Sequence, residues 1–346
     1  MPITIKDIAR KTNFSTASVS RVINGREGVS EKTRKKILAV TKGLNYYPNL
    51  QARGLVVKKP QIIGIIIPQT SETAFSNPYY SEILKGISKR SRESGYYLIL
   101  SFADKESYCR IYQHRVAEGF IILSNRTNDP RLQEARKMKI PMVLIPGFIN
   151  PNKIPSVDID NFNAAFIAVN YLISLGHQRI ALLNGPSNLK YSILRLAGYH
   201  HALKNYHFNF QKDLVSKFDG TQEGGFRAMQ KQLGMKQPPT AVLVFNDYSA
   251  IGALWAAKEM GFRVPEDVSV VGFGDVPFSS KTNPPLTTMH EPLQEIGYEA
   301  TNMLLEVIQG KKLSKRNIIL PVKLVIRQST APPPNYGLWV KISATN

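Results

Sequence analysis

The chain has 346 residues, of which 43% are hydrophobic and 20% charged, so it is long enough for two or three domains with substantial cores. Its single cysteine, Cys109, cannot form a disulfide within the chain or hold a zinc ion with other cysteines. The first residues lack the apolar segment of a secretory signal, and runs such as residues 62–67 are too short to cross a bilayer. We therefore expect a cytoplasmic protein that does not associate with membranes.

The net charge of +20 is densest at the amino end. Residues 1–60 contain 13 Lys and Arg against 3 Asp and Glu, a net charge of +10, and the other 286 residues carry the remaining +10. A compact basic segment attached to a milder body favours a polyanionic partner such as nucleic acid. Charge alone does not distinguish this from a solvated basic surface.

The first 47 residues predict three short helices, the first two joined by a tight turn. Each helix follows a good capping residue; these are Thr4, Ser15 and Ser30. Apolar residues recur at helical spacing, and in the third helix we expect Ile37, Leu38 and Val40 to face inward. The arrangement is typical of a helix-turn-helix unit.

The exposed face of the second helix carries small and polar residues that suit the major groove of DNA. Arg21 can bind both acceptors of a guanine, Ala17 can contact a thymine methyl group, and Thr16 can do either. Three further side chains are expected to bind phosphates and so to position the helix: Ser15, Ser20 and Asn24. The sequence therefore predicts double-stranded DNA as a partner.

A further short helix is expected to begin at Pro48, which suits the first position of a helix. It would last only two turns and contain a glycine, so alone it should be barely stable. Leu55 is an apolar residue near its end, and Arg53 lies close by in the sequence.

From residue 61 the pattern changes to apolar runs that alternate with amphipathic helices. The run at 62–67 is typical of a buried parallel strand. The alternation continues to residue 145, with a helix around 108–114, and a second series begins near Asn161. Such alternation predicts an α/β body with parallel sheets, and two series predict two lobes.

Several motifs resemble the landmarks of one family. They are TIKDIA (4–9), VSRVIN (19–24), PN and ARGL (48–55), LGHQRIA (175–181), RLAGY (195–199), FND (245–247), VPEDVSVVGF (264–273), PLTT (285–288) and IRQST (326–330). Up to about residue 330 the chain resembles the lactose-repressor/galactose-repressor (LacI/GalR) family of bacterial transcriptional regulators. The resemblance implies an α/β body of two parallel-sheet lobes, similar to periplasmic sugar-binding proteins, with a small all-α amino-terminal domain.

The resemblance also implies the domain boundaries. These are a helix-turn-helix headpiece at 1–47, a hinge helix and linker at 48–60, an effector-binding and dimerisation body at 61–330, and a tail at 331–346. The N-lobe would comprise about 61–160 and 292–321, and the C-lobe about 161–291 and 322–330, with crossovers near 160, 291 and 322. Leu55 would open a base step from the minor groove.

The cleft between the lobes is the expected effector site, because open α/β sheets bind ligands beyond the carboxyl ends of their strands. The resemblance implies six effector-binding residues: Tyr79, Tyr80, Ser124, Arg195, Asn246 and Asp275. Asp247 is expected to cap a helix instead, and Asp275 has a turn cap as its alternative role.

Three positions depart from the sugar-binding members of the family. Gly274 stands where an acid is usual, Gly220 where an aromatic residue often stacks on the ligand, and Pro146 where some relatives have an acid. These departures predict a roomier and more basic cleft, which would suit a phosphorylated sugar, another larger or anionic ligand, or no small ligand.

The expected function is repression of carbohydrate-related genes by a homodimer that binds a pseudo-palindromic operator and responds to a sugar, a sugar phosphate or a related metabolite. One alternative is a periplasmic-type solute receptor without a DNA role, and another is a regulator controlled by a protein partner. Motifs for nucleotide binding, acyl transfer and metal-dependent hydrolysis are absent from the sequence, so we expect no catalytic residues, no metal site, no cofactor and no enzymatic activity.

Overall fold

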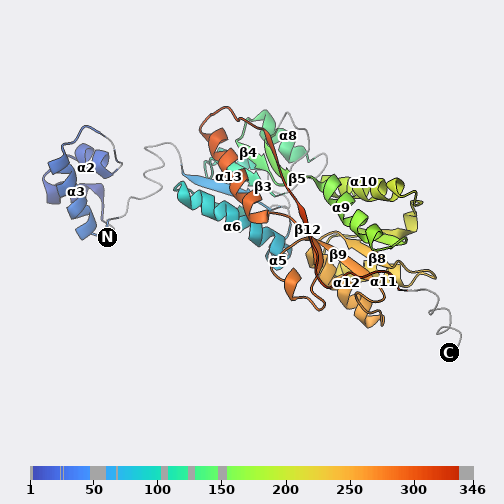
Figure 1. The fold of residues 1–346 in the computed structure, drawn as a ribbon. Helices are drawn as coiled ribbons and strands as arrows, with labels where there is room; N and C mark the ends of the chain where they lie inside the picture. Colours follow the sequence, from blue (N-terminus) through green and yellow to red (C-terminus); the bar gives the residue numbers. More distant parts are fainter. Residues whose placement is uncertain are drawn as a thin grey trace. The chain divides into compact units, whose positions relative to one another are not determined.

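The computed structural model describes residues 3–23, 25, 27–46, 60–67, 69–102, 108–123, 129–146 and 154–334. The chain divides into two compact units, Met1–Gln61 and Ile62–Asn346, which we call the headpiece and the body and describe separately (Figure 1). Four of the predicted site residues lie outside the described residues: Asn24, Arg53, Leu55 and Ser124. The predicted tail is described only as far as residue 334.

Within its described residues the headpiece has three helices, α1 (Ile5–Thr12), α2 (Thr16–Ile23) and α3 (Glu31–Gly43). The Asp7 carboxylate accepts hydrogen bonds from the backbone and hydroxyl of Thr4, and the Ser30 hydroxyl accepts one from the backbone of Thr33, as the predicted caps require. Asn13 makes the turn between α1 and α2 with φ 59°. A small core of five buried residues joins the helices: Ile8, Ala9, Val19, Val22 and Ile37.

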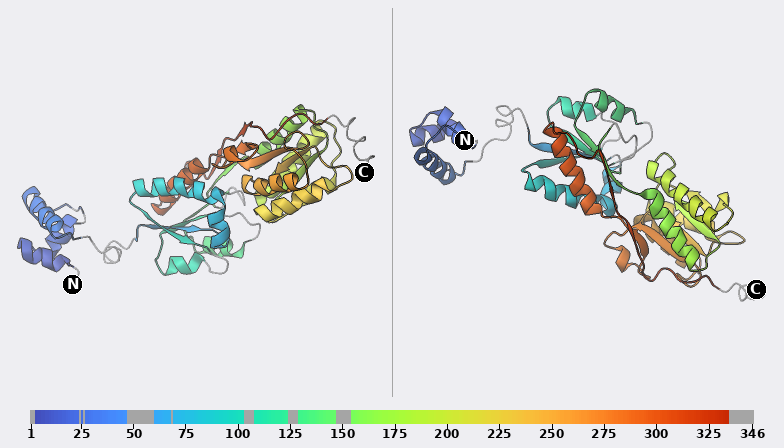
Figure 2. Two further views of the ribbon diagram at one scale, coloured as in Figure 1. Left: turned by 90° about the horizontal axis from the view of Figure 1, so that it is seen from below. Right: turned by 45° about the horizontal axis from the view of Figure 1, so that its top comes forward.

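The N-lobe of the body is a six-stranded parallel sheet in the order β11-β5-β4-β3-β1-β2. Its strands are β1 (Ile62–Ile66), β2 (Tyr97–Ser101), β3 (Gly119–Ile122), β4 (Met142–Leu144), β5 (Ser156–Ile159) and β11 (Asn317–Leu320). Helices α6 (Pro78–Glu93) and α13 (Leu293–Ile308) cover one face, and α7 (Tyr108–Gln113) and α8 (Pro130–Lys137) the other (Figure 2). The short helix α5 (Ser71–Ser76) precedes α6.

The C-lobe has a second six-stranded sheet in the order β12-β10-β9-β8-β6-β7, in which only β12 runs antiparallel to its neighbour. Its strands are β6 (Ile180–Asn184), β7 (Val215–Lys217), β8 (Ala241–Val244), β9 (Ser269–Gly274), β10 (Thr287–His290) and β12 (Lys323–Val325). Helices α9 (Asn161–Ser174) and α10 (Lys190–Asn205) pack together on one face, and α11 (Gln222–Leu233) and α12 (Asp247–Glu259) on the other. The predicted fold class is confirmed.

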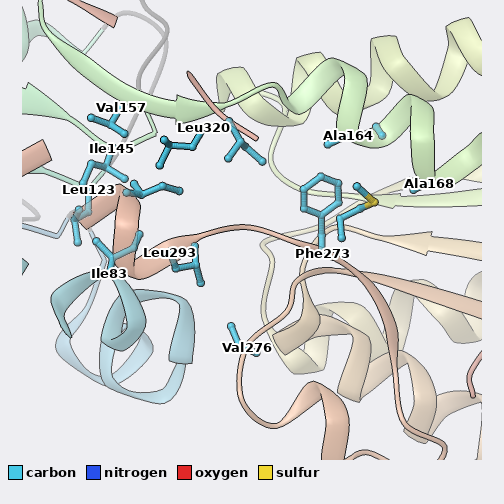
Figure 3. Close-up of a cluster of buried hydrophobic side chains, with 14 of the residues drawn as sticks. Ile83, Leu123, Ile145, Val157, Ala164, Ala168, Phe273, Val276, Leu293 and Leu320 are labelled. Atoms are coloured by element: carbon cyan, nitrogen blue, oxygen red, sulfur yellow. The ribbon is translucent and has the colours of Figure 1, made fainter. Parts of the chain in front are cut away.

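The chain passes between the two lobes three times. It leaves the N-lobe after β5 at Asp160, returns between β10 and α13 at Glu291, and crosses again between β11 and β12 at Pro321. Apolar side chains on both sides of these crossovers belong to one large buried cluster. Figure 3 shows the side chains of Ile83 and Val157 on the N-lobe side and Phe273 opposite Ala164 on the C-lobe side.

Two details of the helices affect the core and the cleft, and the first differs from prediction. Leu38 was expected to face inward, but it is 47% exposed, because the neighbouring Ile37 takes the buried position and successive side chains point about 100° apart around a helix. Helix α10 begins at Lys190, so Tyr191 lies in the first turn of this helix.

The packing of α6 against α13 depends on two glycines that let the backbones touch. A Cβ at Gly86 would lie 1.8 Å from the carbonyl oxygen of Gln294, and a Cβ at Gly297 would lie 2.2 Å from that of Ile83. Backbone atoms at this distance cannot be avoided by a change of side-chain rotamer. The helices would therefore have to separate.

We predict that Gly86→Ala lowers the free energy of unfolding of the body by about 1–3 kcal/mol, because overpacking forces α13 away from α6. Gly43→Ala is the control, since its Cβ would meet nothing within 4 Å, and it should be neutral or stabilising. Chemical denaturation of both variants measures the difference. A Gly86→Ala body as stable as the wild type would contradict the close approach.

Candidate nucleic-acid interface and ligand cleft

Helix α2 presents one polar face and one buried face. Val19 and Val22 pack into the headpiece core, while Thr16, Ala17 and Arg21 are exposed. Ser15 is exposed as well, and its hydroxyl accepts a hydrogen bond from the backbone of Ser18, so it caps the helix as predicted. Ser20 is half-buried beside this face.

The charge of the exposed helix face is available to a ligand. Arg10 and Arg34 each lie 3.8 Å from a carboxylate of their own helix. Arg21 forms no ion pair within the described residues of the headpiece. An exposed guanidinium one turn after a small residue, Ala17, is the arrangement that can reach base edges from the first turns of a recognition helix.

A cleft lies between the lobes of the body, and four of the six predicted effector residues line it. They are Tyr79, Tyr80, Arg195 and Asn246. Asp275 does not line the cleft; its carboxylate instead pairs with Arg327 and lies 2.9 Å from the Nδ1 atom of His290. Ser124 lies outside the described residues.

Arg195 is the centre of a buried network. Its side chain is 8% exposed, and its nitrogens donate to the side chain of Asn161 at 2.9 Å, to the carbonyl of Phe245 at 2.6 Å and to the carboxylate of Glu291 at 2.8 Å. The guanidinium carbon also lies 3.4 Å from the centre of the Phe273 ring. Charge-assisted bonds of this kind compensate a charge that is removed from water.

A second buried carboxylate, Asp158 at the end of β5, lies beside this network. It accepts hydrogen bonds from the backbone of Ile159 at 2.7 Å and from Asn161 at 3.0 Å. Burial, assisted by the nearby charge of Glu291, raises the pKa of Asp158 to about 7, while those bonds and Arg195 act in the opposite direction. Burial also raises the pKa of Glu291, which Arg195 opposes.

One oxygen of each of these carboxylates, Asp158 and Glu291, has no hydrogen-bond partner within the described part of the chain. Both residues line the cleft. They are therefore acceptors available to a ligand with hydroxyl or N–H groups.

Aromatic rings form much of the cleft wall. Six of the described residues contribute them: Tyr79, Tyr80, Tyr191, Phe245, Tyr248 and Phe273. Tyr191 stacks on Phe245 with 5.5 Å between ring centroids, and a Cβ at Gly220 would lie 2.9 Å from Phe245. The ring of Phe245, which follows β8, therefore occupies the space beside Gly220. The prediction that the cleft lacks an aromatic platform is wrong.

The prediction of a more basic cleft is also wrong. Arg195 is the one cation among the described lining residues, against four carboxylates: Asp158, Asp219, Asp247 and Glu291. Gly274 leaves room beside Asp247, whose carboxylate lies 3.6 Å from the position of a Cβ there. An acid is thus present near this strand end, but α12 supplies it.

The helix cap predicted at Asp247 is supplied by Asn246 instead. Asn246 caps α12 by accepting a bond from the backbone of Ser249, and it remains at the cleft wall. Asp247 was expected to be the cap but is fully buried, where it accepts bonds from Thr288, Ser279 and the backbone of Val276. It stabilises the strand ends rather than the helix end.

Sequence reasoning missed Asp158, Asn161, Tyr191 and Glu291. The sequence contained a signal for Asp158, which lies between the apolar residues Val157 and Ile159. Burial of a carboxylate there costs free energy unless the group is hydrogen-bonded or binds a ligand. Glu291 follows β10 at a strand end, where ligands of open sheets bind. Tyr191 gave no signal, since its place depends on where α10 begins.

Comparisons with known proteins agree with this architecture. A family model of bacterial regulatory proteins of the lacI family matches residues 4–49, and one of periplasmic binding protein-like domains matches residues 169–330. The HTH-type transcriptional repressor CytR of Escherichia coli is 34% identical over 337 residues, which cover 96% of this chain and 97% of that protein. The chain belongs to the lacI family.

Solved structures of related lacI-family proteins match this chain over most of its length. The lac repressor dimer bound to operator and the anti-inducer ONPF matches with a TM-score of 0.84 and 30% identity over 96% of this chain and all of that one. The transcriptional regulator CelR in complex with cellobiose matches with a TM-score of 0.74 and 28% identity over 94% of this chain and 99% of that one.

The lacI-family chain is a DNA-binding transcriptional regulator of the helix-turn-helix type. Its relatives are regulators and not enzymes. Among the described residues, no helix is both long and apolar enough to span a bilayer, and no three acidic, histidine or cysteine side chains are grouped to hold a metal ion.

We predict that Asp158→Asn removes a pH dependence of stability. The fold raises the pKa of Asp158 to about 7 from 3.8, so the stabilisation from its proton is complete below about pH 4 and is lost as the pH rises through about 7. The variant cannot ionise there, so its stability relative to the wild type should rise over this pH window. Denaturation at several pH values measures this.

The exposed Asp213→Asn is the control for the loss of one acidic group and should follow the wild type. If Asp158→Asn and the wild type show parallel pH profiles, Asp158 ionises in the folded protein as it does in water.

Proposed function

We propose that this regulator is a dimeric repressor that binds a pseudo-palindromic operator through α2 and is controlled by a neutral, hydroxyl-rich ring compound in the cleft, and that its genes concern carbohydrate use. The observation that carries the proposal is the combination of an exposed α2 face, Thr16, Ala17 and Arg21, with a cleft of free carboxylate oxygens and aromatic walls.

In the DNA complex, Arg21 would read guanine, while Ala17 and Thr16 would contact neighbouring base edges. Ser15 and Ser20 flank this face and would bind phosphates, which fix the register of the helix on the duplex. Asn24, Arg53 and Leu55 are proposed for the same interface on the sequence resemblance alone. A solute receptor would have no use for residues 4–49.

The chemistry of the cleft favours a neutral effector over a phosphorylated one. Three of the five N–H donors of Arg195 already bond Glu291, Asn161 and Phe245, so a phosphate would compete with the Glu291 carboxylate for this guanidinium. Glu291, and Asp158 where it is ionised, would repel an anion, whereas sugar hydroxyls can donate to both. The relative CelR was solved with cellobiose, an uncharged sugar, which agrees with this choice.

Exposed apolar side chains on the body support a homodimer. The edge strand β2 exposes Tyr97, Ile99 and Leu100, and Phe75 is exposed on α5 in the same lobe. Trp255 on α12 is 58% exposed on the C-lobe. An apolar edge strand with unpaired backbone groups favours association, and two-fold symmetry would pair the same surface of each copy.

We predict that Arg21→Ala relaxes the preference for one guanine in each half-site and weakens operator binding by about 1–3 kcal/mol. Selection from random oligonucleotides, followed by binding titrations, measures both effects. Arg10→Ala, at an exposed residue of α1, should keep the wild-type sequence preference. A wild-type chain with no preferred duplex would contradict the proposed function as a whole.

We predict that at least one neutral sugar binds the cleft and that its phosphorylated form binds more weakly. Isothermal titration calorimetry with pairs of neutral and phosphorylated sugars tests this. Tighter binding of a sugar phosphate than of its parent sugar would contradict the effector class. Operator binding that responds to no sugar would favour control by a protein partner.

We predict that Tyr97→Asp raises the dissociation constant of the dimer more than tenfold, since it places a charge at an apolar interface. Tyr206→Asp is the control, because Tyr206 is similarly exposed but lies after α10 on the C-lobe. Sedimentation equilibrium measures both. Equal association of the two variants would show that β2 is not the interface.

A further inference from the structure

A basic groove lies at the amino-terminal edge of the N-lobe sheet. The strands β4, β5 and β11 run parallel to β1 within this sheet, so the segments that precede them meet at the edge where the chain enters β1. The groove is built from the end of α8, the residues before β4 and β5, and the connection from α13 to β11.

Among the described residues, five cations and no carboxylate line this groove. The cations are Arg136, Lys139, Lys311, Lys312 and Arg316. All five are exposed, and none forms an ion pair within the described residues. The floor is apolar and includes Ile140, Met142 and Leu313.

Acidic residues occur close to the groove in the sequence, but they do not line it. Lys137 and Lys315 extend the basic rim in the sequence, whereas Glu134 and Glu306 are the acids that flank it on α8 and α13 and neither lines the groove. Unpaired cations held at close spacing repel one another, so a surface of this kind is stabilised by a polyanion.

The chain connection between the headpiece helices and β1 keeps DNA that the headpiece binds within reach of this edge. Residues 47–61 are the part of the headpiece that connects its three helices to β1, and a segment of this length can extend at most about 50 Å. DNA held by the headpiece is therefore tethered to the sheet edge that carries the groove. A duplex presents one negative charge per ~1.7 Å of its axis, so phosphates are at high local concentration there.

We propose that this groove is a second DNA contact, in which Lys311, Lys312 and Arg316 bind backbone phosphates of the duplex held by the headpiece. The contact reads no sequence; it adds affinity and salt dependence to the recognition by α2. It rests on DNA binding by the headpiece but assigns a DNA-binding role to the body.

The test compares operator binding by two triple variants of the full chain. In the groove variant, Lys311, Lys312 and Arg316 are replaced by Gln. In the control variant, Lys204, Lys231 and Lys236 are replaced by Gln, which removes the same charge from exposed positions on the C-lobe. Affinity for one selected operator duplex is measured between about 50 and 200 mM salt.

The groove variant is expected to bind at least tenfold more weakly at the low end of this range, and its plot of log affinity against log salt should be shallower by about 2–3, since each lost phosphate contact contributes about 0.9. The control variant should keep the wild-type slope. Arg in place of both Lys311 and Lys312 should keep it too, because the charge is retained.

A wild-type slope in the groove variant would overturn the proposal and would favour an acidic protein as the partner of this groove. Equal flattening in the control variant would also overturn it, because the effect would then come from net charge. If the wild type binds its operator normally in either case, the proposed function stands and only this inference fails.

Discussion

The architecture of the body depends on how one buried guanidinium is satisfied. Arg195 comes from α10, and its partners come from the start of α9, the end of β8 and the connection between β10 and α13. A buried ion pair is not stabilising in itself, because desolvation offsets the attraction. Removal of one partner, however, leaves a charge without compensation, at a cost of about 3–5 kcal/mol. The four segments are therefore held to one arrangement.

Much of the fold could be predicted from the sequence, because local patterns determine it. The alternation of apolar runs and amphipathic helices sets the two sheets, and the caps Thr4, Ser15 and Ser30 set the starts of the headpiece helices. Periodicity also has a limited resolution. It placed Leu38 inward with Ile37, since two adjacent residues cannot be ranked by a period of 3.6 when a three-helix core has room for one.

The site was less predictable, because its chemistry depends on contacts between distant segments. Sequence places Asn246 and Asp247 side by side, but only the packing of β9 and β10 against α12 decides which one caps the helix and which is buried. The same holds for Gly220. A missing aromatic residue at one position indicates an empty wall only if nothing else fills the space, and here the ring of Phe245 does.

The positions of the free carboxylates link the chemistry of the cleft to the angle between the lobes. Asp158 is the next-to-last residue of β5, just before the first crossover, and Glu291 lies in the second. A ligand that bonds both fixes the separation of two of the three connections, so its affinity must differ between lobe arrangements that change this separation. That differential affinity is the whole of the free energy by which an effector can shift a population. A compound that touched only Asn246 and the aromatic rings of the C-lobe could bind tightly and still regulate nothing.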